Sequence, residues 1–156
     1  MKDRTRSTTE LVNGIVLNVF KLNGLFVKAA DDLTRGSDLT SARWQVLGAV
    51  LHEQLTVAAI ARSMGLARQS VQRVADVLVA DGLAEYHPNP AHKRAKLLSS
   101  TQKGFIAIQM IRPGVDAWAA GVKDLVGVSE LEELEQRTGD LLSKLLRAEE
   151  DLLKSG

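Results

Sequence analysis

Apolar residues recur at steps of three and four near both ends of the chain, which is the spacing of one face of a helix. The segment from Glu10 to Leu33 predicts a long helix that stops near Gly36. Two further long helices are predicted over residues 101–125 and 129–153. Pro113 lies inside the first of these, where it removes an amide donor, so we expect a kink just before it.

Three shorter helices are predicted between these ends. Thr40 is placed to cap a helix that runs to about residue 51, and Thr56 to cap a short helix that ends near residue 64. Gly65 supplies the left-handed residue that closes the short helix. A helix over residues 67–80 follows directly. A short helix, a glycine-containing turn and a second helix form a helix-turn-helix, whose second helix enters the major groove of DNA.

Beyond Gly82 the pattern changes to short alternating stretches. Residues 83–87 and 95–99 are predicted as two strands around the basic, proline-containing loop 88–94. A helix-turn-helix followed by a basic hairpin is a winged helix-turn-helix. We therefore predict a mainly α-helical fold with a small β-hairpin wing. It comprises an N-terminal helix over residues 1–36, a winged helix-turn-helix lobe over 37–100 and C-terminal helices over 101–156.

The last helix has the most regular apolar spacing in the chain. Ser129 and Glu132 match a capping box at its start. Steps of three and four alternate throughout, which is the heptad spacing of helices that pair. Either the helix docks on its own domain, or it pairs with a second copy of the chain, which makes the terminal helices dimerisation elements. The predicted dimerisation residues are Leu131, Leu134, Leu141, Leu145 and Leu152.

Composition narrows the class of protein. With 156 residues, 45% of them apolar, the chain can bury one core. It has no cysteine, and no two of its three histidines are spaced i, i+4, so neither a metal nor a cofactor is expected. No phosphate-binding loop, nucleophile elbow or paired-carboxylate motif is found, and we do not expect an enzyme. The polar N-terminus leads into no uninterrupted apolar run of membrane-span length, so we expect a soluble, cytoplasmic protein.

The net charge of +1 conceals two segregated regions. Residues 56–103 hold seven basic and three acidic side chains, whereas residues 130–151 hold three basic and eight acidic ones. The basic region coincides with the helix-turn-helix and the hairpin. Arginine can bind guanine O6 and N7, and glutamine can bind adenine N6 and N7. The predicted DNA-binding residues are Arg68, Gln69, Ser70, Gln72 and Arg73 on the second helix, with Lys93 and Arg94 at the hairpin tip.

A second candidate site is a pocket for an aromatic ligand between the long helices and the lobe. Large apolar side chains would line it, and an arginine would bind a carboxylate. The candidate residues are Phe20, Arg43, Trp44, Met110 and Trp118. A purely structural role competes with this interpretation, because both tryptophans also fit the apolar faces of their helices.

The segment from residue 39 to residue 104 resembles the MarR family of bacterial transcriptional regulators. The matching features are Leu39-Thr40, Gln45-Val46-Leu47, Ile60-Ala61, Ser70-Val71, Arg73, Gly82-Leu83, Arg94-Ala95, Thr101 and Gly104. The resemblance implies a homodimer with intertwined N- and C-terminal helices and two winged lobes on a palindromic operator. It also implies relief of repression by a small aromatic or phenolic ligand.

Three positions depart from the family pattern. The family usually has an acidic residue two positions before the wing arginine, and this chain has His92 there. The family usually has an arginine shortly after the Gly-Leu at the start of the strand, and this chain has Tyr86 there. A serine or threonine often opens the second helix of the helix-turn-helix in this family, and this chain has Ala67 there. The wing therefore lacks the usual partner for its internal ion pair, although it keeps its basic character.

The helix-turn-helix, the basic wing and the apolar terminal helices predict a homodimeric regulator that binds double-stranded DNA by sequence. The resemblance implies further that it acts as a repressor and is released by a small aromatic ligand. A winged-helix protein-interaction module without DNA binding is the alternative, with the acidic last helix as its docking surface. An enzymatic or ligand-carrying helical protein would require a polar catalytic cluster, which the sequence does not contain.

Overall fold

The computed structural model describes residues 6–92 and 94–154, with the backbone alone for residues 149, 150 and 152–154. The chain forms two compact units, whose boundary lies between Arg112 and Pro113 within one long helix. This helix remains continuous through Pro113, where the sequence predicts a kink.

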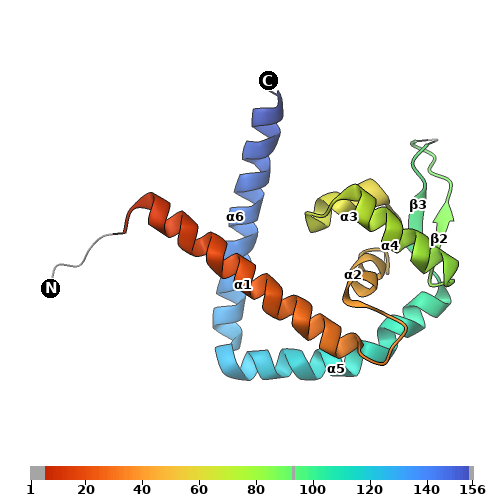
Figure 1. Cartoon of the computed structure of the whole chain (residues 1–156), viewed down its shortest axis with the longest axis horizontal. Coiled ribbons are helices and arrows are strands. Elements are labelled where there is room, and N and C mark those ends of the chain that lie inside the picture. Colours follow the sequence, from red (N-terminus) through yellow and green to blue (C-terminus); the bar gives the residue numbers. More distant parts are fainter. Residues whose placement is uncertain (1–5, 93, 155–156) are drawn as a thin grey trace. The chain divides into compact units, whose positions relative to one another are not determined.

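The first unit contains the helix-turn-helix and a small sheet (Figure 1). Its elements in chain order are α1 (Thr8–Thr34), α2 (Ser41–Ala49), β1 (Leu55–Thr56), α3 (Val57–Met64), α4 (Arg68–Ala80), β2 (Ala84–His87) and β3 (Leu97–Ser100), followed by the start of α5 (Gln102–Val126). The predicted fold class, mainly α-helical with a β-hairpin wing, is confirmed.

Local signals explain where the short helices begin and end. The hydroxyl of Thr40 accepts a hydrogen bond from the Arg43 amide at 3.3 Å, and that of Thr56 accepts one from the Ala59 amide at 3.1 Å. Gly65 closes α3 in the left-handed conformation, with φ 62°. All three signals are where the sequence predicts them.

The first helix, α1, is mostly exposed. A capping box between Ser7 and Glu10, which was not predicted from the sequence, fixes its N-terminus. Its C-terminal end is buried at Ala30 and Thr34, where it contacts α2. Large apolar side chains are exposed along the rest of the helix: Leu11, Val12, Ile15, Val16, Leu17, Val19, Phe20, Leu22, Leu25, Phe26 and Val27.

By length and composition alone, α1 is apolar enough to cross a membrane, because it contains an unburied stretch of 18 residues with a mean hydropathy of 1.3. This stretch was not predicted from the sequence. Asn18 and Asn23 interrupt the apolar run but leave its mean hydropathy high. A helix that is apolar on all sides is equally typical of one that is covered by other protein.

The sheet has the strand order β1-β3-β2, and both pairings are antiparallel. Leu98 on the central strand pairs with Leu55 on β1 and with Tyr86 on β2. The hairpin of β2 and β3 is as predicted. The two-residue strand β1 was not predicted, because it forms only by pairing with a strand more than 40 residues further along the chain.

One apolar core holds this lobe together, and the hairpin, α2, α3, α4 and the start of α5 all contribute to it. Its largest fully buried side chains are Leu47, Ile60, Leu78, Leu83, Leu98, Val46, Val50 and Val71. Burial of each such side chain contributes about 1.5–3 kcal/mol. This core fixes the position of α4 relative to the wing.

The second unit consists of the rest of α5 and of α6 (Val128–Lys154). The predicted capping box is wrong in position, because α6 begins at Val128 and Ser129 therefore lies inside it. Gly127, with φ 89°, ends α5, and its carbonyl accepts the first hydrogen bond of α6 from the Leu131 amide at 3.2 Å. A left-handed glycine thus replaces the expected side-chain cap.

Candidate nucleic-acid interface

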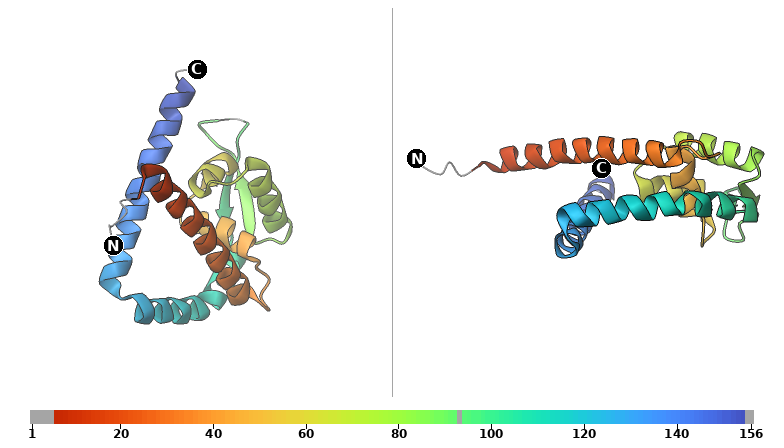
Figure 2. Two further views of the ribbon diagram at one scale, coloured as in Figure 1. Left: turned by 60° about the vertical axis from the view of Figure 1, so that its left-hand side comes forward. Right: turned by 90° about the horizontal axis from the view of Figure 1, so that it is seen from below.

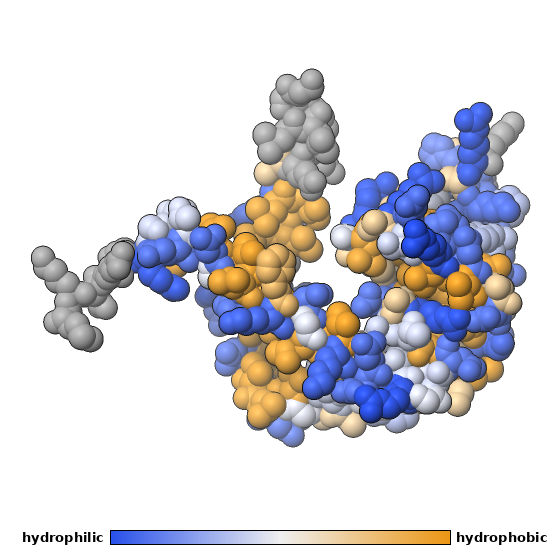
Figure 3. Space-filling view, viewed as in Figure 1, coloured by the Kyte–Doolittle hydropathy of each residue, from blue (hydrophilic) through white to orange (hydrophobic). Residues whose placement is uncertain are grey.

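The second helix of the helix-turn-helix, α4, presents one polar and one apolar face. Val71, Ala75 and Leu78 are buried in the core. The opposite face is exposed near the N-terminus and carries the predicted residues Arg68, Gln69, Ser70 and Arg73, with Gln72 half-buried beside them. Hydrophilic side chains gather around α4 and the wing (Figure 3). The helical period thus brings the predicted readers to one surface.

The N-terminus of α4 has no side-chain cap, in contrast to those of α2 and α3. Ala67 occupies the cap position and makes no capping hydrogen bond with its side chain. The Ser70 amide donates to the carbonyl of Ala67 at 2.9 Å, so the amides of Arg68 and Gln69 remain available. Together with the helix dipole they favour an anion such as a phosphate.

The wing projects from the lobe between β2 and β3 (Figure 2). Its turn is shaped by Asn89, whose side-chain oxygen accepts a hydrogen bond from the Ala91 amide at 3.0 Å and whose carbonyl accepts one from the His92 amide at 3.2 Å. Arg94 is exposed on this turn. Lys93, also predicted to bind DNA, lies outside the described residues.

A hydrogen-bonded triad of Gln72, Asp76 and Tyr86 joins α4 to the wing. Nε2 of Gln72 lies 2.8 Å from Oδ1 of Asp76 and 2.8 Å from the hydroxyl of Tyr86. The hydroxyl of Tyr86 donates to the same Asp76 oxygen at 2.9 Å. Burial, and then the carboxylate of Asp76, raise the pKa of Tyr86 to about 12.

A cavity of about 320 Å³ opens between α4 and the wing, and the triad forms part of its wall. Three cationic side chains line the same cavity: Arg68 from α4, and Arg94 and Lys96 from the wing. The ammonium of Lys96 lies 5.8 Å from the centre of the Tyr86 ring. Helix and wing therefore form one continuous cationic surface, suited to a polyanion.

Asp76, Tyr86 and Lys96 belong to this surface but were not among the predicted site residues. Tyr86 offered a signal, because it stands where the family usually has an arginine. In the structure its hydroxyl, rather than a guanidinium, contacts the carboxylate of Asp76. Asp76 offered none, because an acidic residue on a basic helix resembles an ordinary solvated charge.

The residues predicted to bind an aromatic ligand are not gathered in one of the described cavities. Phe20 and Met110 are exposed, by 68% and 74%, and Trp44 packs against the core of the lobe. Trp118 belongs to the second unit. Arg43 alone lines a described cavity, of about 630 Å³, where α2 approaches the end of α4.

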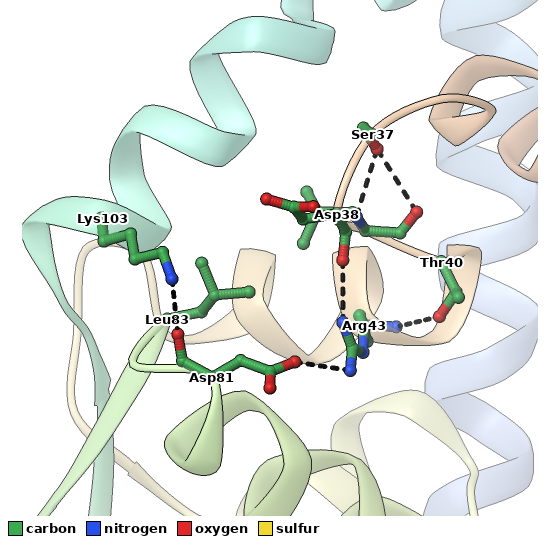
Figure 4. A pocket seen from close by; sticks show the side chains of 8 residues that line it. Ser37, Asp38, Thr40, Arg43, Asp81, Leu83 and Lys103 are labelled. Atoms are coloured by element: carbon green, nitrogen blue, oxygen red, sulfur yellow. Dashed lines mark hydrogen bonds and ion pairs between the residues drawn. The ribbon is translucent and has the colours of Figure 1, made fainter.

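The guanidinium of Arg43 is already bound within this cavity (Figure 4). It donates to Oδ2 of Asp81 at 2.7 Å and to the carbonyl of Asp38 at 2.8 Å. Nζ of Lys103 donates to the carbonyl of Asp81 at 2.7 Å. Any carboxylate ligand of Arg43 must therefore compete with Asp81.

The predicted dimerisation residues form a stripe on α6. In the single chain, Leu134, Leu141 and Leu145 are exposed by 49%, 39% and 60%, and Leu131 is half-buried. The side chain of Leu152 lies outside the described residues. Among the described residues there is no group of three or more His, Asp or Glu side chains that could hold a metal ion.

The fold and its cationic surface define a winged helix-turn-helix protein. A sequence model of the MarR family matches residues 37–95, from the segment before α2 to the wing. The uncharacterized proteins Rv2011c of Mycobacterium tuberculosis and Mb2034c of Mycobacterium bovis are each 42% identical to the chain over 97 residues, which is 62% of this chain and 68% of each relative. The chain belongs to the MarR family.

Solved structures with the same fold include a MarR-family regulator from Rhodococcus, with a TM-score of 0.74 and 17% identity over 88% of this chain and 96% of that one. A mutant of MarR from E. coli in complex with operator DNA has a TM-score of 0.71 and 19% identity, over 88% and 99% of the two chains. The MepR–DNA complex of S. aureus has a TM-score of 0.71 and 18% identity, over 83% and 96%. The family and the fold are those of transcription regulators, not of enzymes.

Proposed function

We propose that the protein is a homodimeric repressor that binds a palindromic operator in double-stranded DNA. The observation that carries this proposal is the exposed Arg/Gln face of α4, uncapped at its N-terminus and continuous with a cationic wing. Two proteins of the same fold, MarR of E. coli and MepR of S. aureus, have been solved with DNA.

Each lobe would place the N-terminal half of α4 in the major groove. Arg68 and Arg73 would bind guanine, and Gln69, Ser70 and Gln72 would contact neighbouring base edges or phosphates. Lys93 and Arg94 at the wing tip would contact the backbone or enter the adjacent minor groove. The Asn89 turn supports this role, because it shapes the loop that projects from the lobe.

Dimerisation follows from the apolar surface that the single chain leaves exposed. Residues 11–27 of α1 carry apolar side chains on all sides, and α6 carries the leucine stripe. We assign residues 1–36 and 101–156 to the dimer interface and residues 37–100 to DNA binding. A two-fold axis would then place the two α4 helices about 34 to 36 Å apart, or a small multiple of this distance, along the duplex.

The same dimer explains the apolar character of α1 without a membrane. A helix that is apolar on all sides must be covered by lipid or by protein. In a DNA-binding regulator, the second subunit of the dimer would cover it. We therefore assign the protein to the cytoplasm.

Release of the repressor by a small aromatic ligand is the finer part of the proposal. The guanidinium of Arg43 lines a cavity, where a ligand with a carboxylate would bind it by displacing Asp81. None of Phe20, Trp44, Met110 and Trp118 lines this cavity, so we do not assign them to it.

In vitro selection of duplexes from a random library tests the function directly. We expect an inverted repeat, bound by the dimer. If about six to ten phosphates are contacted, affinity should fall by about 10³ to 10⁵ between about 50 and 200 mM salt. Failure to enrich any duplex at low salt would favour the alternative, a winged-helix protein-interaction module that docks through the acidic face of α6.

A further inference from the structure

The side-chain amide of Gln72 is held in one orientation by the triad that joins α4 to the wing. Its nitrogen donates both of its hydrogens, one to Asp76 at 2.8 Å and one to the hydroxyl oxygen of Tyr86 at 2.8 Å. The hydroxyl in turn donates its only hydrogen to Asp76 at 2.9 Å. Both hydrogens of the Gln72 amide and the hydrogen of the Tyr86 hydroxyl are thus engaged within the triad.

The reversed amide is excluded by charge. A rotation of the terminal amide by half a turn would place Oε1 of Gln72 against the carboxylate of Asp76, which can only accept hydrogen bonds when ionised. Tyr86 cannot compensate, because its proton already serves Asp76. The raised pKa of Tyr86, about 12, keeps this proton in place across the physiological range.

The other end of the amide remains available. No described residue forms a hydrogen bond to Oε1 of Gln72. Among the described residues, no buried side-chain oxygen or nitrogen lacks a partner, so Oε1 must reach solvent. The one polar atom of this side chain that is left for another molecule is therefore an acceptor.

We infer that Gln72 reads DNA as a hydrogen-bond acceptor only, with Asp76 and Tyr86 as the positioning residues that withhold its amide hydrogens. The inference rests on the proposed function and names the base-edge chemistry at that same surface. Only adenine N6 and cytosine N4 present hydrogen-bond donors in the major groove. A free glutamine would bind adenine N6 and N7 together, whereas the tied Gln72 accepts adenine or cytosine alike.

This arrangement predicts a degenerate operator position. One position in each half-site should accept adenine or cytosine with affinities within about threefold of each other, because each offers one donor to one acceptor. Guanine and thymine present only acceptors there, and should bind about tenfold more weakly or worse. The position is identified as the one that loses its preference in Gln72→Ala.

The decisive variant combines Asp76→Ala with Tyr86→Phe, which removes both partners of the amide nitrogen. We expect the degenerate position to narrow to adenine, with about tenfold preference over cytosine, because the freed amide now binds N6 and N7 together. Adding Gln72→Ala to this double variant should abolish the new preference. Removal of Asp76 and of the Tyr86 hydroxyl would thus sharpen base specificity. A merely structural role of these two residues would not produce this result.

Hydrogen exchange of the Gln72 side-chain amide tests its hydrogen bonds to Asp76 and Tyr86 without DNA. In the ¹⁵N-labelled protein, the NH₂ hydrogens of Gln72 should exchange about tenfold more slowly than those of Gln69, which is exposed on the same helix turn. In the double variant, the side-chain amide hydrogens of Gln72 should exchange as fast as those of Gln69. Equal rates in the unmodified protein would overturn the inference, whatever the operator sequence.

The outcomes separate the inference from the function on which it rests. An operator with adenine alone, guanine or thymine at the Gln72 position would overturn the inference and leave DNA binding intact. So would an operator on which Gln72→Ala changes no preference. If the unmodified protein selects no duplex at all, the proposed function falls, and the inference with it.

Discussion

A Cβ atom on Gly104 would lie 2.0 Å from the carbonyl oxygen of Leu83. The first turn of α5 thus presses directly on the start of β2. The hydroxyl of Thr101 supports this contact, because it donates to the carbonyl of Gly82 at 2.7 Å and accepts from the Gly104 amide at 3.1 Å. This junction sets where the long helix α5 leaves the lobe.

Replacing Gly104 by alanine should therefore destabilise the protein, because two backbone segments would have to move apart. We expect a loss of about 1–3 kcal/mol in the free energy of unfolding, measured by urea denaturation. Gly48, an exposed helical glycine with nothing within 4 Å of the added Cβ, is the matched control. Its change to alanine should stabilise by up to about 1 kcal/mol. Equal effects of the two substitutions would contradict the close contact at Gly104.

The parts of the fold that depend on local sequence were predictable. Thr40 and Thr56 cap their helices through contacts three residues away, and Gly65 ends α3 through its own backbone conformation. The strand β1 was not predictable in this way, since its two residues acquire their structure from Leu97 and Leu98. The start of α6 was misplaced because Ser129 and Glu132 match a capping box. The left-handed conformation of Gly127 instead starts the helix at Val128.

The candidate site divides along the same line. The exposed face of α4 follows from helical spacing, so its arginines and glutamines could be named from the sequence. The role of Asp76 could not, because it depends on the register of β2, which brings Tyr86 within 2.9 Å of its carboxylate. Bidentate reading by Gln72 was a reasonable prediction for an isolated helix, and the neighbouring strand is what restricts it.

Arg73 is the residue with which base reading by α4 is best tested. If it binds a guanine, Arg73→Ala should cost roughly 1–3 kcal/mol on the selected operator and flatten the preference at one position in each half-site. Binding to random duplexes is the internal control, and equal losses on both would identify a phosphate contact instead. Arg137→Ala on α6 removes the same charge outside the proposed DNA-binding surface and should leave base preferences unchanged.

The leucine stripe of α6 predicts the assembly state. Leu141→Asp would bury an unpaired charge between subunits, so we expect the dimer to dissociate or the protein to unfold. Ser143, two residues further along the helix, lies on the opposite face, and Ser143→Asp should leave the dimer intact. Analytical ultracentrifugation distinguishes the two variants. A soluble Leu141→Asp protein that still sediments as a dimer would remove α6 from the interface.

Competition between Asp81 and a ligand predicts how effector binding responds to mutation. If an aromatic carboxylate such as benzoate binds Arg43, Asp81→Asn should tighten its binding by up to about fivefold, since a half-exposed ion pair contributes about 0.2–1 kcal/mol. Arg43→Ala should abolish binding. Asp38→Asn is the control, because Asp38 binds Arg43 through its carbonyl and not its side chain. Calorimetric titration that finds benzoate bound equally by Arg43→Ala would exclude this cavity.

The ionisation of Tyr86 tests the triad by a different route. Because the chain has one tyrosine, the ultraviolet absorbance of the phenolate, which appears as the pH rises, reports this residue alone. We expect the phenolate to form with a pKa of about 12 in the folded protein, against 10.0 ordinarily, because burial and then Asp76 disfavour the charged form. Since folding raises the pKa, the folded state binds the proton more strongly. The resulting stabilisation is complete below pH 10 and is lost as the pH rises towards 12.

The controls for this titration separate its two causes. Protein unfolded in urea should titrate near the ordinary value, and circular dichroism at each pH must show that the unmodified protein remains folded. Asp76→Asn removes the charge but leaves the burial, so it should lower the pKa of Tyr86 without returning it to 10.0. If Asp76→Asn has no effect on the titration, the carboxylate does not face the hydroxyl in solution.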